Sequence, residues 1–254
     1  MIDKLNLCFG FYDYLLIFAV AALGTFSAYL KDPQLKAVCA TIPVPFGFAY
    51  LTLEMPIGAA NAGSAILCFL FVHIVRLLTY KAHLHVIFSI FVGICVFILI
   101  GALLLPYLPT EEWFFLLICA FDFSLGVLVF QKQSYRHGVH HKTPLPIYIK
   151  APAVAAVVAM LMVIKKILGG FATSFPMMNS IVSYESRHSL GDQCRQLPLF
   201  LIAGPFMFIV MRYTELLLHF NRWIVLAIGV TLYMALFYPL NKELKRRNQM
   251  ATRD

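Results

Sequence analysis

Charged residues are scarce in this sequence, and their scarcity excludes most classes of protein. Asp, Glu, Lys and Arg make up 13% of the 254 residues, while hydrophobic residues make up 61% and the mean hydropathy is +0.82. A soluble domain carries about 25% charged residues, which cover its water-exposed surface. Because this chain has too few charges to do so, the sequence predicts an integral membrane protein.

Motifs for catalysis and metal binding are lacking as well. The chain has no GxSxG or HExxH pattern, and its six cysteines show no CxxC spacing, so most of them are interpreted as small hydrophobic residues. No carboxylate or thiolate stands at ligand spacing beside the histidines of "KAHLH" and "RHGVHH", which favours basic loops meeting anionic lipid over a metal site. We therefore predict that the protein is not an enzyme and that it binds no cofactor and no metal ion.

What the chain does contain is a series of apolar runs about as long as a membrane-crossing helix. The alternating pattern of outer-membrane strands is missing, so the runs are expected to be helical. The prediction is an all-α, polytopic membrane protein with a single membrane domain over 1–254 and an uncleaved first helix. Its nine expected spans are 13–30, 37–53, 57–79, 84–107, 113–130, 146–164, 167–184, 197–218 and 222–240.

The distribution of basic residues supports nine spans. With nine spans, 15 Lys and Arg residues fall on one side of the membrane and 5 on the other, whereas re-entrant 37–53 and 167–184 segments give 9 against 11. Lys and Arg accumulate on the cytoplasmic side. This predicts an outside N-terminus, an inside C-terminus and a basic cytoplasmic tail over 241–254. The net charge of +8 is thus assigned to topology and lipid contact, and no nucleic-acid partner is expected.

Two parts of the chain, 13–107 and 146–240, follow the same plan. Each has a plain helix, a proline-bearing helix, a helix ending in polar groups and another plain helix. A shift of 133 residues places the following residues opposite each other: Leu35 and Leu168, Thr41 and Ser174, Pro43 and Pro176, and Gly58 and Gly191. The single linking helix 113–130 would turn the second half over, giving an inverted 4+1+4 repeat as in many secondary transporters. The alternative is that any string of apolar helices looks self-similar.

The segment "GGFATSFPMMNSIVSY", the apolar helix closing in "MRYTELLLHF" and the last span together resemble the GlpM-type family of small bacterial membrane proteins of unknown function. The resemblance covers mainly 146–240, so the chain looks like a doubled version of that family. It implies a multi-pass protein of the bacterial inner (cytoplasmic) membrane. It implies no role for any particular residue.

Prolines interrupt two of the expected spans and create candidate binding groups. A proline removes one backbone donor and displaces the carbonyl group four residues before it. The carbonyl groups freed in this way belong to Cys39, Thr41 and Ala172, ahead of Pro43, Pro45 and Pro176. Freed carbonyl groups can coordinate a cation and broken-helix N-termini attract anions, although a packing kink without any ligand is the simpler interpretation.

Other polar residues lie within or at the ends of the spans. Asp122 stands at the middle of 113–130, where a carboxylate must be paired, protonated or hydrated, so it is a candidate proton or cation site or else a neutral packing group. Arg212 and Glu215 are spaced to pair along one helix face. That pair, and His73 with Arg76, are interpreted as interfacial clusters.

The leading hypothesis is a permease of secondary-transporter type that moves a small solute or ion and is proton-coupled through Asp122. Its midplane binding residues are predicted to be Thr41, Pro43, Pro45, Ser174, Pro176 and Asn179. Gating is assigned to Glu54 at one end and to Glu185, Arg187 and Asp192 at the other. The alternative is a non-catalytic accessory or assembly component of a transport or envelope system, and a lipid-headgroup enzyme using 185–192 is less favoured. The lipid bilayer is the expected partner, and a homo-oligomer is compatible with the composition.

Overall fold

The computed structural model describes residues 10–53, 55–133, 148, 151–152, 154–156, 158–159 and 168–250, and in these ranges it is helical, without strands. Seven helices in the described part are long and apolar enough to cross a membrane. They are α1 (Phe11–Tyr29), the pair α2 (Pro33–Thr41) and α3 (Val44–Leu53), α4 (Ala59–Tyr80), α5 (Val86–Leu104) with η2 (Leu105–Tyr107), α6 (Glu112–Lys132), α9 (Leu190–Leu218) and α10 (Arg222–Met250). The all-α, multi-pass character predicted from the composition agrees with this architecture.

The two remaining predicted spans are not among these seven. The 146–164 segment lies largely outside the described residues. The 167–184 segment forms two short pieces, the 3-10 helix η3 (Gly169–Ser174) and α8 (Met177–Glu185). The prediction of nine spans therefore remains a prediction.

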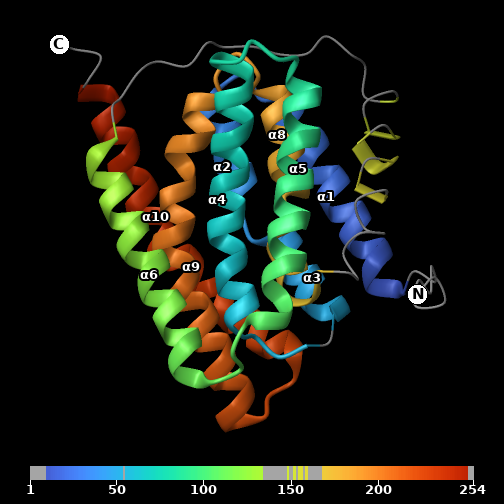
Figure 1. The fold of residues 1–254 in the computed structure, drawn as a ribbon, viewed down its shortest axis with the longest axis vertical. Helices are drawn as coiled ribbons and strands as arrows, with labels where there is room; N and C mark the ends of the chain where they lie inside the picture. The colour runs from blue at the N-terminus through green and yellow to red at the C-terminus, as the bar shows by residue number, and fades with distance from the viewer. Residues whose placement is uncertain are drawn as a thin grey trace.

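The long helices alternate in direction, so their ends meet at two opposite ends of the molecule (Figure 1). At one end, the last turns of α4 and α6 meet the first turn of α9, and Arg247 of α10 donates to the Phe130 carbonyl. At the other end, Arg212 of α9 pairs with Glu112 at the start of α6. Most described Lys and Arg residues lie toward the first of these, which we call the basic end.

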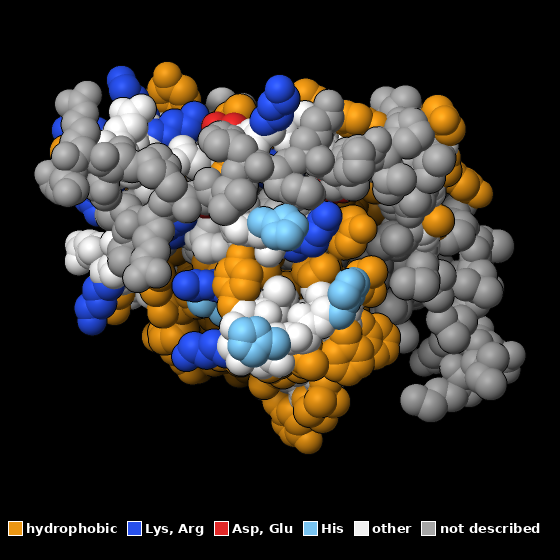
Figure 2. Space-filling model, turned by 90° about the horizontal axis from the view of Figure 1, so that it is seen from above, with side chains coloured by type: hydrophobic (Ala, Val, Ile, Leu, Met, Phe, Trp, Pro, Cys, Tyr) orange, Lys and Arg blue, Asp and Glu red, His pale blue; other side chains and the backbone are white. Residues whose placement is uncertain are grey.

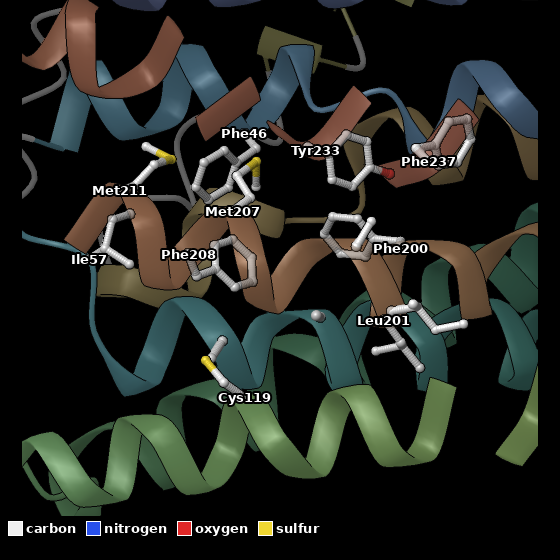
Figure 3. Packing of buried hydrophobic residues seen from close by; sticks show 14 of the residues in the cluster. Phe46, Ile57, Cys119, Phe200, Leu201, Met207, Phe208, Met211, Tyr233 and Phe237 are labelled. Carbon is white, nitrogen blue, oxygen red and sulfur yellow. The ribbon is translucent and has the colours of Figure 1, made fainter. Parts of the chain in front are cut away.

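Helix α9 is the centre of the packing and contacts α2, α4, α6 and α10. Its buried side chains meet those of α3, α4, α6 and α10 in one apolar cluster, part of which is shown in Figure 3. Gly126 lets α6 approach α9 closely, because a Cβ atom there would lie 2.9 Å from Leu201 Cβ and 3.1 Å from the Ile202 nitrogen. Two interrupted helical segments complete the bundle: α2–α3 packs on α9 through α2, and η3–α8 packs mainly on α4 and α1.

Both incomplete helices break where the sequence places proline. Helix α2 starts with Asp32 capping the Gln34 N–H (2.9 Å) and Pro33 in its first turn, and it ends at Thr41, two residues before Pro43. The 3-10 helix η3 ends at Ser174, two residues before Pro176. Proline lacks a backbone donor and its ring crowds the preceding turn. Beyond each proline a new helix therefore begins, α3 after the first break and α8 after the second.

The polar connection after α8 is shorter than the sequence predicts. The predicted spans leave 185–196 outside the membrane, but α9 already begins at Leu190 and its first two turns are mostly buried. Hydropathy misses these turns because their polar side chains are buried against other polar groups. At the far end of the chain, α10 continues through Met250, so that residues 241–250 of the predicted tail are helical.

Candidate functional site

The two proline breaks line one small cavity of about 40 Å³. The end of α2 and the start of α3 form one wall, the end of η3 and the start of α8 form another, and Cys68 of α4 with Leu197 and Phe200 of α9 close it. Five of the six residues that the sequence predicts as midplane binding groups lie in its walls: Thr41, Pro43, Pro45, Ser174 and Asn179. Pro176 is not in the lining, although it sits at the second break. We call this space the break cavity.

At the first break, the backbone groups freed by proline find partners elsewhere. The Thr41 carbonyl accepts a hydrogen bond of 2.7 Å from the hydroxyl of Tyr233, which is fully buried on α10. The Thr41 hydroxyl donates to the Val38 carbonyl one turn earlier, at 2.9 Å. The Thr41 carbonyl thus has a partner from a distant helix, and the second lone pair of its oxygen is available for a ligand.

At the second break, a set of buried amides joins α8 to α4 and α9. Asn179 donates to the Cys68 sulfur at 3.0 Å. The Gln193 amide nitrogen donates to both the carbonyl and the side-chain oxygen of Asn179, at 3.0 and 3.1 Å, and its oxygen accepts from the Ser183 hydroxyl at 2.8 Å. Ala172, whose carbonyl the sequence predicts to be freed, accepts from the Phe175 N–H at 3.2 Å. No sequence pattern pointed to Gln193.

The 3-10 helix before the second break is fixed to α4 by Asn61. Its amide nitrogen donates to the Gly170 carbonyl at 3.3 Å and to the Thr173 hydroxyl at 3.2 Å, while its oxygen accepts from the Gly58 N–H at 2.8 Å. Gly170 is required for this contact, since a Cβ atom there would lie 2.8 Å from Ala60 Cβ. The second break is thus positioned by polar contacts on both sides.

The break cavity offers polar groups that can bind a very small ligand. The Ser174 hydroxyl oxygen is buried and has no hydrogen-bond partner among the described residues. The last turns of α2 and η3 present carbonyl groups toward the breaks, and the first turns of α3 and α8 present N–H groups. A water molecule needs about 10–15 Å³ of such space. In this conformation a cavity of about 40 Å³ therefore holds a few waters or an ion stripped of its hydration shell, and a larger solute requires the cavity to open.

Asp122 lies on the buried face of α6, apart from the break cavity. Its side chain is 0% exposed, and neither carboxylate oxygen has a hydrogen-bond partner among the described residues. Cys119 and Gly126 share this face, which packs against α9 and α4. Asp122 is absent from the lining of the break cavity, so the structure does not bring the predicted coupling residue into contact with the predicted binding residues.

The predicted gating residues lie at the basic end, except for Glu54, which is outside the described residues. Glu185 is buried, and its carbonyl accepts from the Lys36 ammonium group at 3.1 Å. Arg187 donates to the Tyr184 carbonyl at 3.2 Å and lies over the Tyr184 ring. Asp192 pairs with Arg195 one turn along α9. None of these residues lines the break cavity.

The predicted pairing of Arg212 with Glu215 is wrong. Arg212 instead pairs with Glu112 (2.6 Å) and donates to the Ile57 carbonyl, while Glu215 accepts from the Tyr50 hydroxyl (3.2 Å) and lies 3.7 Å from Arg222. Both side chains therefore connect helices instead of pairing along one face. The spacing of three residues places Arg212 and Glu215 on one helix face and so favoured the local pair. It contains no information about which other helices bring charged groups to this end.

Among the described residues, no group of three or more His, Cys, Asp or Glu side chains is placed to hold a metal ion. His137, His140 and His141 lie outside those residues. Of the five described cysteines, four are buried and all are free thiols. Comparisons of this chain with known protein families, with curated proteins and with solved structures give no match.

Proposed function

We propose that this chain is a membrane permease of secondary-transporter type, which binds a small solute or ion in the break cavity. The observation that carries the proposal is the meeting of two interrupted helical segments, α2–α3 and η3–α8, around one small cavity lined mostly by buried side chains. Interrupted helices near the membrane centre are the usual way in which a transporter offers backbone groups to a substrate.

The positions of the breaks support the inverted repeat that the sequence suggests. Helix α2 ends at Thr41 and η3 at Ser174, and the difference 174 − 41 is 133. Helix α3 begins at Val44 and α8 at Met177, and the difference 177 − 44 is again 133. The shift that overlays the two sequence halves therefore also overlays the two structural breaks.

The packing between the two halves of the chain also supports the inverted repeat. Helix α2 packs on α9, and η3 packs on α4; α3 packs on α10, and α8 packs on α5. Under the proposed repeat, α4 corresponds to α9 and α5 to α10, so each interrupted segment packs on the helices of the other half. Such reciprocal exchange is expected of two halves related by a two-fold axis in the membrane plane, with α6 as the linking helix of a 4+1+4 plan.

We assign the coupling of transport to protons to Asp122. Keeping an ionised carboxylate buried without a partner costs several kcal/mol, so the protonated form fits this buried position, and the charged form requires water or a cation beside it. With Asp122→Asn, transport should fall and lose its dependence on the pH gradient while expression stays normal. Unchanged pH-dependent transport by this variant in proteoliposomes would remove Asp122 from the coupling.

We further propose that the basic end faces the cytoplasm, because Lys and Arg residues accumulate there. α1 starts at the other end and α10 finishes at the basic end, so the proposed orientation is N-terminus out and C-terminus in (Figure 1). The inner membrane as location and the resemblance to GlpM-type proteins both stay predictions.

The native cysteines provide a direct test of the permease. Cys68 lines the break cavity and Cys119 lies in the α6 interface outside it, and both are nearly fully buried. Two variants, each retaining only one of these cysteines, should be treated with a small, charged thiol reagent in right-side-out and inside-out vesicles. A cavity that opens during transport should make Cys68 react from at least one side, while Cys119 stays unmodified.

The other candidate functions predict different results. An accessory or assembly component needs no opening, so Cys68 should then react no faster than Cys119, and that outcome would refute the permease. An enzyme acting through 185–192 is not favoured by the geometry, because Asp192 pairs with Arg195 and Glu185 is buried. Turnover of a lipid headgroup by detergent-extracted protein would support the enzyme hypothesis instead.

A further inference from the structure

A second and much larger cavity, of about 790 Å³, opens at the basic end, and the proposed transport does not use it. It is formed by the last turns of α4 and α6 and the first turn of α9. Its charged residues and histidines are His73, Arg76, Lys132, His188, Asp192 and Arg195. Figure 2 shows Lys, Arg and His side chains gathered on the described part of this face. We call this space the basic cavity.

Positive charge exceeds negative charge in the basic cavity. Asp192 is the sole carboxylate in its described lining, and it pairs with Arg195. Arg76 and Lys132, from two different helices, form no ion pair with a carboxylate within the described ranges. The permanent positive charges of Arg76 and Lys132 therefore have no carboxylate partner in the part of the chain that the structure describes.

Membrane topology alone does not explain this arrangement. The tendency of Lys and Arg to lie at the cytoplasmic end accounts for basic residues scattered over that face. It does not require that Arg76, Lys132 and Arg195, from three helices, line one hollow, while Lys81, five residues after Arg76, stays outside it. The N-terminus of α9, with Ser189 and Gly191, opens into the same hollow and adds the partial positive charge of a helix start.

We propose that the basic cavity binds a doubly charged phosphate group, either free or as a monoester. The positive charges of Arg76 and Lys132 match the charge of a phosphate dianion. The planar guanidinium of Arg76 can donate two parallel hydrogen bonds to its oxygens, and the ammonium of Lys132 supplies a second point of contact. A volume of about 790 Å³ also leaves room for an organic group attached to the phosphate, since ligand pockets are typically about 300–1,000 Å³.

The phosphate can come from a soluble compound or from the headgroup of a membrane lipid, because the basic cavity lies at an end of the membrane-spanning helices. Both sources present the same chemistry to Arg76 and Lys132. This binding does not depend on the permease, so either proposal can fail while the other stands.

Binding of inorganic phosphate to the purified full-length protein in neutral detergent tests the proposal. Isothermal titration at constant ionic strength should give saturable binding, which chloride does not reproduce. Loss of one charge-assisted contact should weaken phosphate binding about tenfold in Arg76→Gln and in Lys132→Gln. Lys81→Gln is the matched control, because it removes one exposed charge from the same end without touching the cavity, and its affinity should stay unchanged.

Two results would overturn the proposal. The first is the absence of saturable phosphate binding, and the second is an equal loss of phosphate affinity in Lys81→Gln and Arg76→Gln. Because Arg76 and Lys132 stand on different helices, a fold defect in one variant leaves the other as an independent test, with gel filtration as the check.

A lipid comparison then identifies the source of the phosphate. The titration is repeated in nanodiscs of phosphatidylcholine alone and with added phosphatidic acid, whose headgroup is a phosphate monoester. If phosphatidic acid weakens inorganic phosphate binding to the parent protein but not to the Lys132→Gln variant, the ligand is a lipid headgroup. If it has no effect while phosphate still binds, the ligand is a soluble phosphate compound. Both outcomes support the site.

Discussion

The two interrupted segments share a plan but are held in place by different forces. Segment α2–α3 has one side-chain hydrogen bond at its break, from Tyr233 to the Thr41 carbonyl, and one near each end, from Lys36 to the Glu185 carbonyl and from Tyr50 to Glu215. Elsewhere it makes apolar contacts, such as Gly47 against Leu226. Segment η3–α8 is bound by the amides of Asn61 and Gln193, which together make five side-chain hydrogen bonds to it. The second segment is therefore fixed close to its break by more direction-dependent contacts, and the first relies more on packing there.

This difference bears on how a permease would open the break cavity. Apolar surfaces slide with little penalty, whereas each buried hydrogen bond that breaks without replacement costs about 1–3 kcal/mol. We therefore expect η3–α8 to stay fixed on α4 and α9 and α2–α3 to move against it. Three substitutions test whether the two segments differ in this way.

The largest effect is expected from Gln193→Leu. Gln193 is 1% exposed, and its loss leaves the Asn179 oxygen and the Ser183 hydroxyl buried without partners. The free energy of unfolding should fall by about 2–4 kcal/mol, as measured by SDS titration in mixed micelles. Gln133→Leu is the matched control, because Gln133 makes one hydrogen bond to the Arg195 carbonyl at the half-buried end of α6. A loss for Gln193→Leu no greater than for Gln133→Leu would show that the amide contacts do not fix the second segment.

Much of the fold was predictable, because membrane spans are long apolar runs. The predicted spans 13–30, 57–79 and 113–130 lie within a few residues of α1, α4 and α6. The start of α9 was not predictable, since its first two turns are polar and yet buried. Their low hydropathy predicts that these residues are solvent-exposed, whereas their burial depends on partners that only the folded chain supplies.

The candidate site was predictable to a similar, partial degree. Proline marks the two breaks, and the repeat suggests that the breaks meet, so Thr41 and Ser174 were named from the sequence. The residues that hold the breaks were not, because Asn61, Gln193 and Tyr233 come from other helices. Which side chain faces a break depends on how each helix is rotated, which helix periodicity in an almost uniformly apolar sequence does not reveal.

A medium effect is expected from Gly170→Ala, in the second segment. The new Cβ atom would lie 2.8 Å from Ala60 Cβ, an atom next to the backbone that cannot turn away. Overpacking of this kind costs about 1–3 kcal/mol of unfolding free energy. Gly47→Ala is the counterpart in the first segment, where the new atom meets only the flexible tip of Leu226 at 3.2 Å and gains helix propensity. Its effect should be near zero in the same SDS titration, and equal losses for the two variants would contradict the difference between the segments.

The smallest effect is expected from Tyr233→Phe, which removes the one side-chain hydrogen bond at the first break. The ring stays stacked on Phe237, with centroids 5.5 Å apart, so only the hydroxyl donor to the Thr41 carbonyl is lost. Such a bond within a membrane protein contributes about 0.6–1 kcal/mol. The unfolding free energy should fall by that amount, well below the loss for Gln193→Leu, while the thiol reagent should reach Cys68 faster because the first segment moves more freely. A loss as large as that of Gln193→Leu, or unchanged Cys68 reactivity, would mean that α2–α3 is not the segment that moves.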